Sequence, residues 1–148
     1  MAPPRALIIE ARFYTDINDM LLAGARAELK EAGFEHETVT VPGVLEIPPA
    51  LSMAMVSARR RNLSIEAYVA LGCVIRGETG HYDIVAGEGN RALMDLAVDN
   101  RLALGNGILT VENRAQAIER ADPGRKNKGA DAAAAAVALY KLRAALRS

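Results

Sequence analysis

The chain has 148 residues, enough for one domain, and 51% of them are hydrophobic, which is ample for a buried core. Its 18 basic and 18 acidic side chains give a formal net charge of zero, which argues against a dominant affinity for nucleic acid or anionic membranes. One cysteine excludes an internal disulfide framework, no apolar run reaches membrane-spanning length, and the first residues lack the apolar core of a signal peptide. We therefore expect a single cytoplasmic domain over residues 1–148.

Apolar runs alternate with amphipathic stretches along the chain. Residues 67–71 have almost no polar break, as in a strand that is covered on both faces. After Gly80 the apolar residues recur at helical spacing. The first helix is expected to begin at a cap among Thr15, Asp16 and Asn18 and to stop at Gly33. The other predicted elements are strands over residues 6–9, 37–41, 67–71 and 107–111, and helices over residues 46–61, 81–97, 114–121 and 130–146.

This strand–helix alternation predicts the fold class. It implies a three-layer α/β sandwich, with a four-stranded parallel sheet, right-handed crossovers and helices on both faces. The expected strand order is 2-1-3-4, which reverses direction between the first and third strands. Ligands bind such sheets outside the carboxyl ends of the strands, at that reversal. Four loops with unusual residues meet there, over residues 12–14, 41–46, 76–81 and 111–113.

His81 is the central candidate for catalysis. It stands where a glycine-bearing loop leads into a helix, an arrangement that offers free backbone N–H groups to a phosphate. A surface capping role is the alternative. The glycines and the hydroxyl of Thr79 beside it favour proton transfer.

Other candidates have ordinary structural explanations beside the functional ones. Cys73 lies in a strand and is expected to be a small core residue. Phe13 is either a core residue or an aromatic face for a flat ring. Glu46, Arg120 and Lys128 suit a helix end or solvent equally well. Two histidines and one cysteine give no zinc spacing, so we expect no metal site.

Six motifs, in order and covering nearly the whole chain, resemble those of the 6,7-dimethyl-8-ribityllumazine synthase family, in which a parallel sheet has the flavodoxin-like order expected above. They are Arg12-Phe13; Val41-Pro42-Gly43-x-x-Glu46-Ile47-Pro48; Leu71-Gly72-x-Val74-Ile75-Arg76-Gly77-x-Thr79-x-His81-Tyr82-Asp83; Gly107-Ile108-Leu109-Thr110-Val111-Glu112-Asn113; Gln116-Ala117-x-Glu119-Arg120-Ala121; and Asn127-Lys128-Gly129.

The resemblance implies a reaction in riboflavin biosynthesis. 5-Amino-6-(ribitylamino)uracil condenses with 3,4-dihydroxy-2-butanone 4-phosphate to give the lumazine, phosphate and water, with no cofactor. The expected steps are imine formation, phosphate elimination, attack by the ribitylamino nitrogen and ring closure.

The resemblance also implies roles for individual residues. His81 matches the general acid and base, and Phe13 the aromatic side chain that stacks on the pyrimidine. The residues that match the ribityl and ring contacts are Val44, Leu45, Glu46, Cys73, Val74 and Ile75. Those that match the phosphate side are Glu78, Thr79, Arg120 and Lys128.

Family members form rings with the site between subunits. One chain is expected to supply Phe13, Glu46 and His81, and its neighbour Asn106, Arg120 and Lys128. Because the first strand begins almost at once, we expect a pentamer rather than a hollow shell.

Two positions depart from the family. Asn106 replaces a bulky side chain, and Gly80 stands where a hydroxyl is frequent. They leave open a flavin- or lumazine-binding protein without turnover, and a structural scaffold is a further alternative. His81, Thr79 and Arg120 favour the enzyme, because binding alone needs no proton relay.

Overall fold

A computed structural model describes residues 2–147. Within this range the chain forms a four-stranded parallel sheet with the order β2-β1-β3-β4, so the predicted topology is confirmed. The strands are β1 (Arg5–Ala11), β2 (Glu35–Val41), β3 (Ala67–Ile75) and β4 (Leu104–Val111). The helices are α1 (Thr15–Glu31), the short 3-10 helix η1 (Val44–Glu46), α2 (Ile47–Arg60), α3 (His81–Asn100), α4 (Arg114–Ala121) and α5 (Lys128–Arg147).

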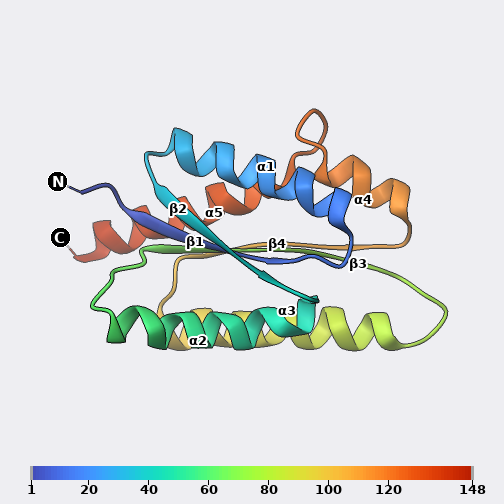
Figure 1. Cartoon of the computed structure of the whole chain (residues 1–148), viewed down its shortest axis with the longest axis horizontal. Coiled ribbons are helices and arrows are strands. Elements are labelled where there is room, and N and C mark those ends of the chain that lie inside the picture. Colours follow the sequence, from blue (N-terminus) through green and yellow to red (C-terminus); the bar gives the residue numbers. More distant parts are fainter. Residues whose placement is uncertain (1, 148) are drawn as a thin grey trace.

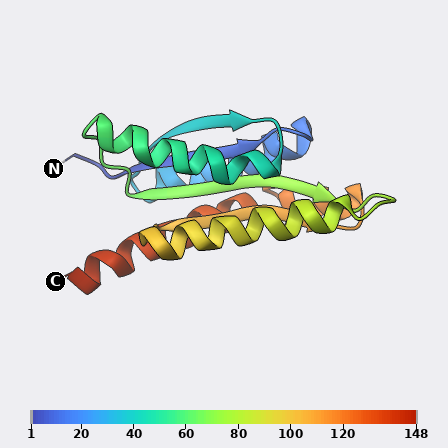
Figure 2. The same cartoon turned by 90° about the horizontal axis from the view of Figure 1, so that it is seen from below.

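Helices cover both faces of the sheet. Figure 1 shows α1, α4 and α5 on one side and α2 and α3 on the other, and Figure 2 shows α2 and α3 from their own side. Alternate residues of a strand serve the two layers, since Ile8 packs with the α1 side whereas Leu7 and Ile9 pack with the α2 side. The central strands β1 and β3 therefore need the continuous apolar runs that predicted them, whereas β2, at the edge of the sheet, alternates polar and apolar residues.

The start of α1 differs from its prediction. Its cap residue is Tyr14, in an extended conformation, and Asn18 does not cap the helix but is buried against Glu10. The start of α2 lies one residue later than predicted, because η1 takes up Glu46 first. Pro48 then occupies the first turn of α2, where a missing N–H costs no hydrogen bond.

The two ends of the sheet differ in character. The described parts of both termini lie at one end, and the loop between β3 and α3 lies at the other (Figure 1). Among residues 2–147, no helix is long and apolar enough to cross a bilayer. The carboxyl ends of the strands, which the candidate residues follow, thus lie at the opposite end of the sheet from the described parts of the termini.

Candidate active site

A pocket of about 210 Å³ opens at the carboxyl ends of β1 and β3, and we call it the His81 pocket. The end of β1 leads into Phe13, η1 contributes Val44 and α3 begins at His81. The lining residues are Phe13, Tyr14, Gly43, Val44, Cys73, Val74, Ile75, Gly77, Thr79, His81, Tyr82 and Val85. Most of them are apolar, so the pocket suits a flat heterocycle with few polar contacts.

His81 is the first residue of α3 and lies exposed at the pocket. Its backbone N–H donates to Thr79 Oγ1 at 3.3 Å. Gly80, the cap residue of α3, has no side chain to cover the free N–H groups of the first turn. The imidazole therefore stands beside a helix end that favours negative charge.

Arg76 fixes the beginning of the same loop. Its Nε donates to Glu112 Oε2 at 2.9 Å, its Nη1 lies 3.5 Å from Asp83 Oδ1, and its guanidinium carbon lies 4.2 Å from the centre of the Tyr82 ring. These contacts join the ends of β3 and β4 to the first turn of α3. The helix that carries His81 is thereby tied to the sheet.

Cys73 confirms its prediction as a core residue, because its side chain is buried in β3. Burial raises the pKa of this thiol to about 11. Burial also raises the pKa of Tyr14, which lines the same pocket. Both groups are therefore neutral near pH 7, and neither supplies a nucleophilic anion there.

A second concavity, of about 360 Å³, lies along β4 and α5, and we call it the Arg120 groove. Its lining residues are Asn106, Gly107, Ile108, Leu109, Thr110, Arg120, Lys128, Asp131, Ala132 and Ala135. Arg120 Nη1 donates to Gln116 O at 3.1 Å, which leaves further donors of the guanidinium for an anion. Lys128 Nζ lies 3.4 Å from Asp131 Oδ2.

The amide of Asn106 is already engaged within the chain. Its Nδ2 donates to Asn90 Oδ1 at 2.8 Å, and its Oδ1 accepts from the backbone N–H of Ile108 at 2.9 Å. These contacts link the edge strand β4 to α3 and satisfy one of its edge donors. In this arrangement Asn106 braces the groove wall.

The structure places most of the predicted site residues in two concavities and leaves three of them outside both. Seven of them line the His81 pocket: Phe13, Val44, Cys73, Val74, Ile75, Thr79 and His81. Asn106, Arg120 and Lys128 line the Arg120 groove. Leu45, Glu46 and Glu78 line neither, although Glu46 Oε1 lies 3.1 Å from where a Cβ on Gly43 would stand, at the rim of the pocket.

Sequence reasoning gave no site role to five residues that line the pocket, namely Tyr14, Gly43, Gly77, Tyr82 and Val85. Tyr14 and Tyr82 are the two among them with a polar side chain. Tyr14 directly follows Phe13 and Tyr82 directly follows His81, so adjacency to a predicted site residue was the signal available. Over residues 2–147, no three His, Cys, Asp or Glu side chains gather as a metal site would require.

Comparison with known proteins gives one consistent result. The sequence profile described as 6,7-dimethyl-8-ribityllumazine synthase matches residues 3–144. Proteins of that name are similar to this chain in Methylorubrum populi (56% identity, covering 98% of this chain and 86% of the relative), Methylocella silvestris (60%, 92% and 83%) and Novosphingobium aromaticivorans (59%, 93% and 94%).

Proposed function

The chain belongs to the 6,7-dimethyl-8-ribityllumazine synthase family, and we propose how its residues carry out the reaction. Its activity in riboflavin biosynthesis is the condensation of 5-amino-6-(ribitylamino)uracil with 3,4-dihydroxy-2-butanone 4-phosphate, which yields 6,7-dimethyl-8-ribityllumazine, phosphate and water. The observation that supports the assignment of roles is the His81 pocket, which an exposed aromatic ring and an imidazole both line at the end of a parallel sheet.

The pyrimidine ring occupies the His81 pocket in this proposal. Phe13 is 72% exposed at the pocket, so its face is free to stack on a flat ring. The backbone of Cys73, Val74 and Ile75 offers hydrogen-bonding groups to the ring edge. The ribityl chain lies along η1, where the backbone of Val44 and Leu45 and the carboxylate of Glu46 meet its hydroxyl groups.

His81 transfers protons during the condensation. Imine formation needs a proton on the departing hydroxyl group, and elimination of phosphate needs a base to remove a proton from carbon. An imidazole serves both steps, because its ring nitrogens can both donate and accept a proton. His81 lines the same pocket as Phe13, which supports this role.

Phosphate is bound from two sides. Glu78 and Thr79 belong to the loop before α3, whose free N–H groups attract an anion. Arg120 supplies a planar guanidinium that suits a dianionic phosphate, and Lys128 adds a second positive charge. Because Arg120 and Lys128 line the groove and His81 lines the pocket, we place the two sets on neighbouring chains.

We propose a homopentamer, in which each Arg120 groove faces the His81 pocket of the next chain. Exposed apolar side chains on α2 and α3 support an interface, namely Met53, Val56, Ile84, Met94 and Val98. Light scattering should give a particle about five times the 15.8 kDa mass of one chain. A 15.8 kDa particle at working concentration would contradict the shared site.

A turnover assay tests the catalytic role. Purified protein is mixed with both substrates, and the fluorescent lumazine is followed beside His81→Ala and an enzyme-free control, because the condensation proceeds slowly unaided. We expect rapid formation by the wild type and roughly 100-fold slower formation by the variant. Equal rates would remove the role of His81, and a folded protein that binds lumazine without a rate above the control would be a binding protein.

A further inference from the structure

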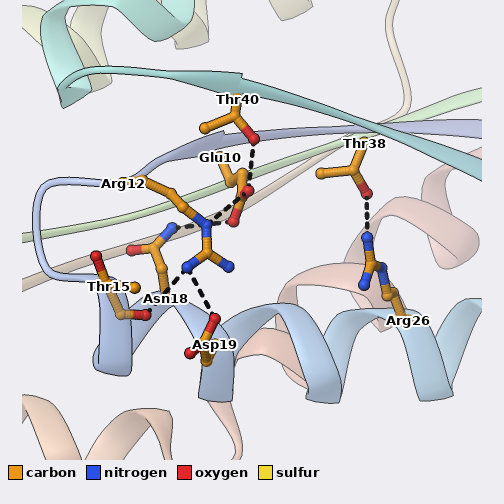
Figure 3. A network of polar contacts seen from close by, with 8 residues as sticks. All are labelled: Glu10, Arg12, Thr15, Asn18, Asp19, Arg26, Thr38 and Thr40. Carbon is orange, nitrogen blue, oxygen red and sulfur yellow. Dashed lines mark hydrogen bonds and ion pairs between the residues drawn. The ribbon is translucent and has the colours of Figure 1, made fainter.

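A carboxylate is buried where β1 leaves the sheet. Glu10 is only 3% exposed, and side chains from β2, α1 and the end of β1 point toward it (Figure 3). Its Oε2 accepts from Arg12 Nε at 2.9 Å and from Thr40 Oγ1 at 2.6 Å. Its Oε1 accepts from Asn18 Nδ2 at 3.5 Å. The parallel register places Thr40 directly beside Glu10, so the sheet itself brings the two together.

Arg12 extends this network to α1. Its Nη1 donates to Thr15 O at 3.2 Å and lies 2.8 Å from Asp19 Oδ1 (Figure 3). Its backbone N–H donates to Val41 O at 3.0 Å. The hydrogen bond to Glu10 raises the pKa of Arg12, so the guanidinium stays charged. One side chain thus joins β1, β2 and the first turn of α1.

Phe13 is the next residue of the chain after this network, and its side chain takes no part in the network's hydrogen bonds. It directly follows Arg12, and its ring meets the Tyr14 ring edge-on with 4.9 Å between centroids. Because 72% of Phe13 is exposed, packing of its own ring restrains it little. The backbone on its N-terminal side, fixed by Arg12, must set where the ring points.

Stability alone does not explain a buried carboxylate at this position. The neighbouring strand residues are apolar, and an apolar side chain in place of a buried ion pair is often neutral or stabilising. The carboxylate is instead useful as a hub, since it accepts hydrogen bonds from three elements and fixes their relative positions. It joins the ends of β1 and β2 to the first turn of α1, and residues just beyond the two strand ends line the His81 pocket.

We propose that Glu10 and Arg12 are positioning residues that hold Phe13 in the orientation that stacks on the pyrimidine ring. This inference rests on the ring-binding role given to Phe13. It predicts that damage to the network weakens binding of the ring substrate and leaves binding of the butanone phosphate and the chemical steps nearly unchanged.

The first test is Glu10→Gln, which keeps the shape and removes the charge. We expect about a fivefold rise in KM for the ribitylaminouracil, with kcat and KM for the butanone phosphate changed less than about twofold. Thr40→Val removes only one hydrogen bond to the carboxylate and should give a smaller rise of the same kind, which serves if Glu10→Gln folds poorly. Arg26→Ala is the matched control, because it breaks an exposed bond between the same helix and strand, to Thr38, outside the hydrogen bonds of Glu10 (Figure 3).

A double-mutant cycle separates positioning from general stability. If Glu10 acts through Phe13, then Glu10→Gln should change KM for the ring substrate less than about 1.5-fold in a Phe13→Ala background. A fivefold effect in that background would overturn the proposal, and so would changes of equal size in kcat and in both KM values. Fluorescence titration with 6,7-dimethyl-8-ribityllumazine gives the same cycle for binding, so absence of turnover would contradict the proposed function without deciding this inference.

Discussion

The His81 pocket and the Arg120 groove differ in the chemistry of their walls. The pocket has mainly apolar walls, with one imidazole and one exposed aromatic ring at its edge. The groove carries two cationic side chains, Arg120 and Lys128, with only Asp131 as a counter-charge in its lining. The first suits a flat, uncharged ring, and the second suits a phosphate.

This difference is the reason why we propose that two neighbouring chains build each site. The condensation needs the ring, the proton-transfer group and the phosphate ligand within a few ångströms of one another. Among the described residues, none lines both concavities. In the proposed pentamer, a second copy brings its cationic groove to the apolar pocket, and each half then supplies what the other lacks.

Removing the cation of the groove should have the largest effect. We expect Arg120→Ala to lower kcat/KM by roughly 100-fold, or about 3 kcal/mol, because the phosphate loses a charged hydrogen-bonding partner in a closed interface. Steady-state kinetics with varied butanone phosphate measures it. Lys126→Ala is the control, since this exposed cation is near in sequence but does not line the groove. A similar loss in the control would point to overall charge rather than to a phosphate contact.

Removing the aromatic face of the pocket should have a smaller and different effect. Phe13→Ala should raise KM for the ribitylaminouracil roughly 10- to 30-fold, or about 2 kcal/mol, through lost stacking and lost apolar contact. KM for the butanone phosphate should change little. Equal changes in the KM values for the two substrates would contradict a pocket that binds the ring and a groove that binds the phosphate.

The pH dependence of stability tests the apolar character of the pocket wall. Because the folded state raises the pKa of Cys73 to about 11, the unfolded chain loses this proton first as the pH rises above 9, the ordinary pKa of the thiol. Stability should therefore fall between pH 9 and 11, with a Cys73 contribution of up to about 1.4 kcal/mol per pH unit. Denaturant unfolding of wild type and Cys73→Ala across this range measures it. Parallel curves for the two proteins would mean that the thiol ionises freely in the folded state.

A hydroxyl at Gly80 should have the smallest effect. Gly80 caps α3 with a negative φ of −71°, and beyond its immediate surroundings in the chain no described atom lies within 4 Å of where a Cβ would stand. Gly80→Ser should add a capping hydrogen bond worth a few tenths of a kcal/mol and raise Tm by about 1–2 °C. Gly77→Ser, which has equal space but caps no helix, should give no gain. Thermal unfolding of both variants compares them.

The fold was largely predictable from local pattern. Apolar runs, the polar–apolar alternation of residues 37–41 and helical periodicity located the four strands and the main helices of the described residues, and the order of strands and helices predicted a parallel sheet. The start of α1 was not predictable in detail. Asn18 has the chemistry of a cap, but its side chain instead donates a hydrogen bond to the buried carboxylate of Glu10 in β1.

The site was predictable only in part. The resemblance implied both sets of residues, and the structure places one at the carboxyl ends of β1 and β3 and the other along the edge strand β4 and α5. Glu10 has no signal in the sequence, because a single carboxylate at a strand end has no distinctive spacing. Its importance emerges only when Thr40, Asn18 and Arg12 are seen around it.

A mixed-oligomer experiment tests the shared site most directly. His81→Ala and Arg120→Ala chains, each nearly inactive alone, are co-expressed with different tags and the mixed oligomers are purified. If His81 and Arg120 act from neighbouring chains, about a quarter of the interfaces in a random mixture combine an intact pocket with an intact groove, and about a quarter of wild-type activity returns. Activity no higher than that of either variant alone, in oligomers shown to contain both chains, would contradict a site that is shared between copies.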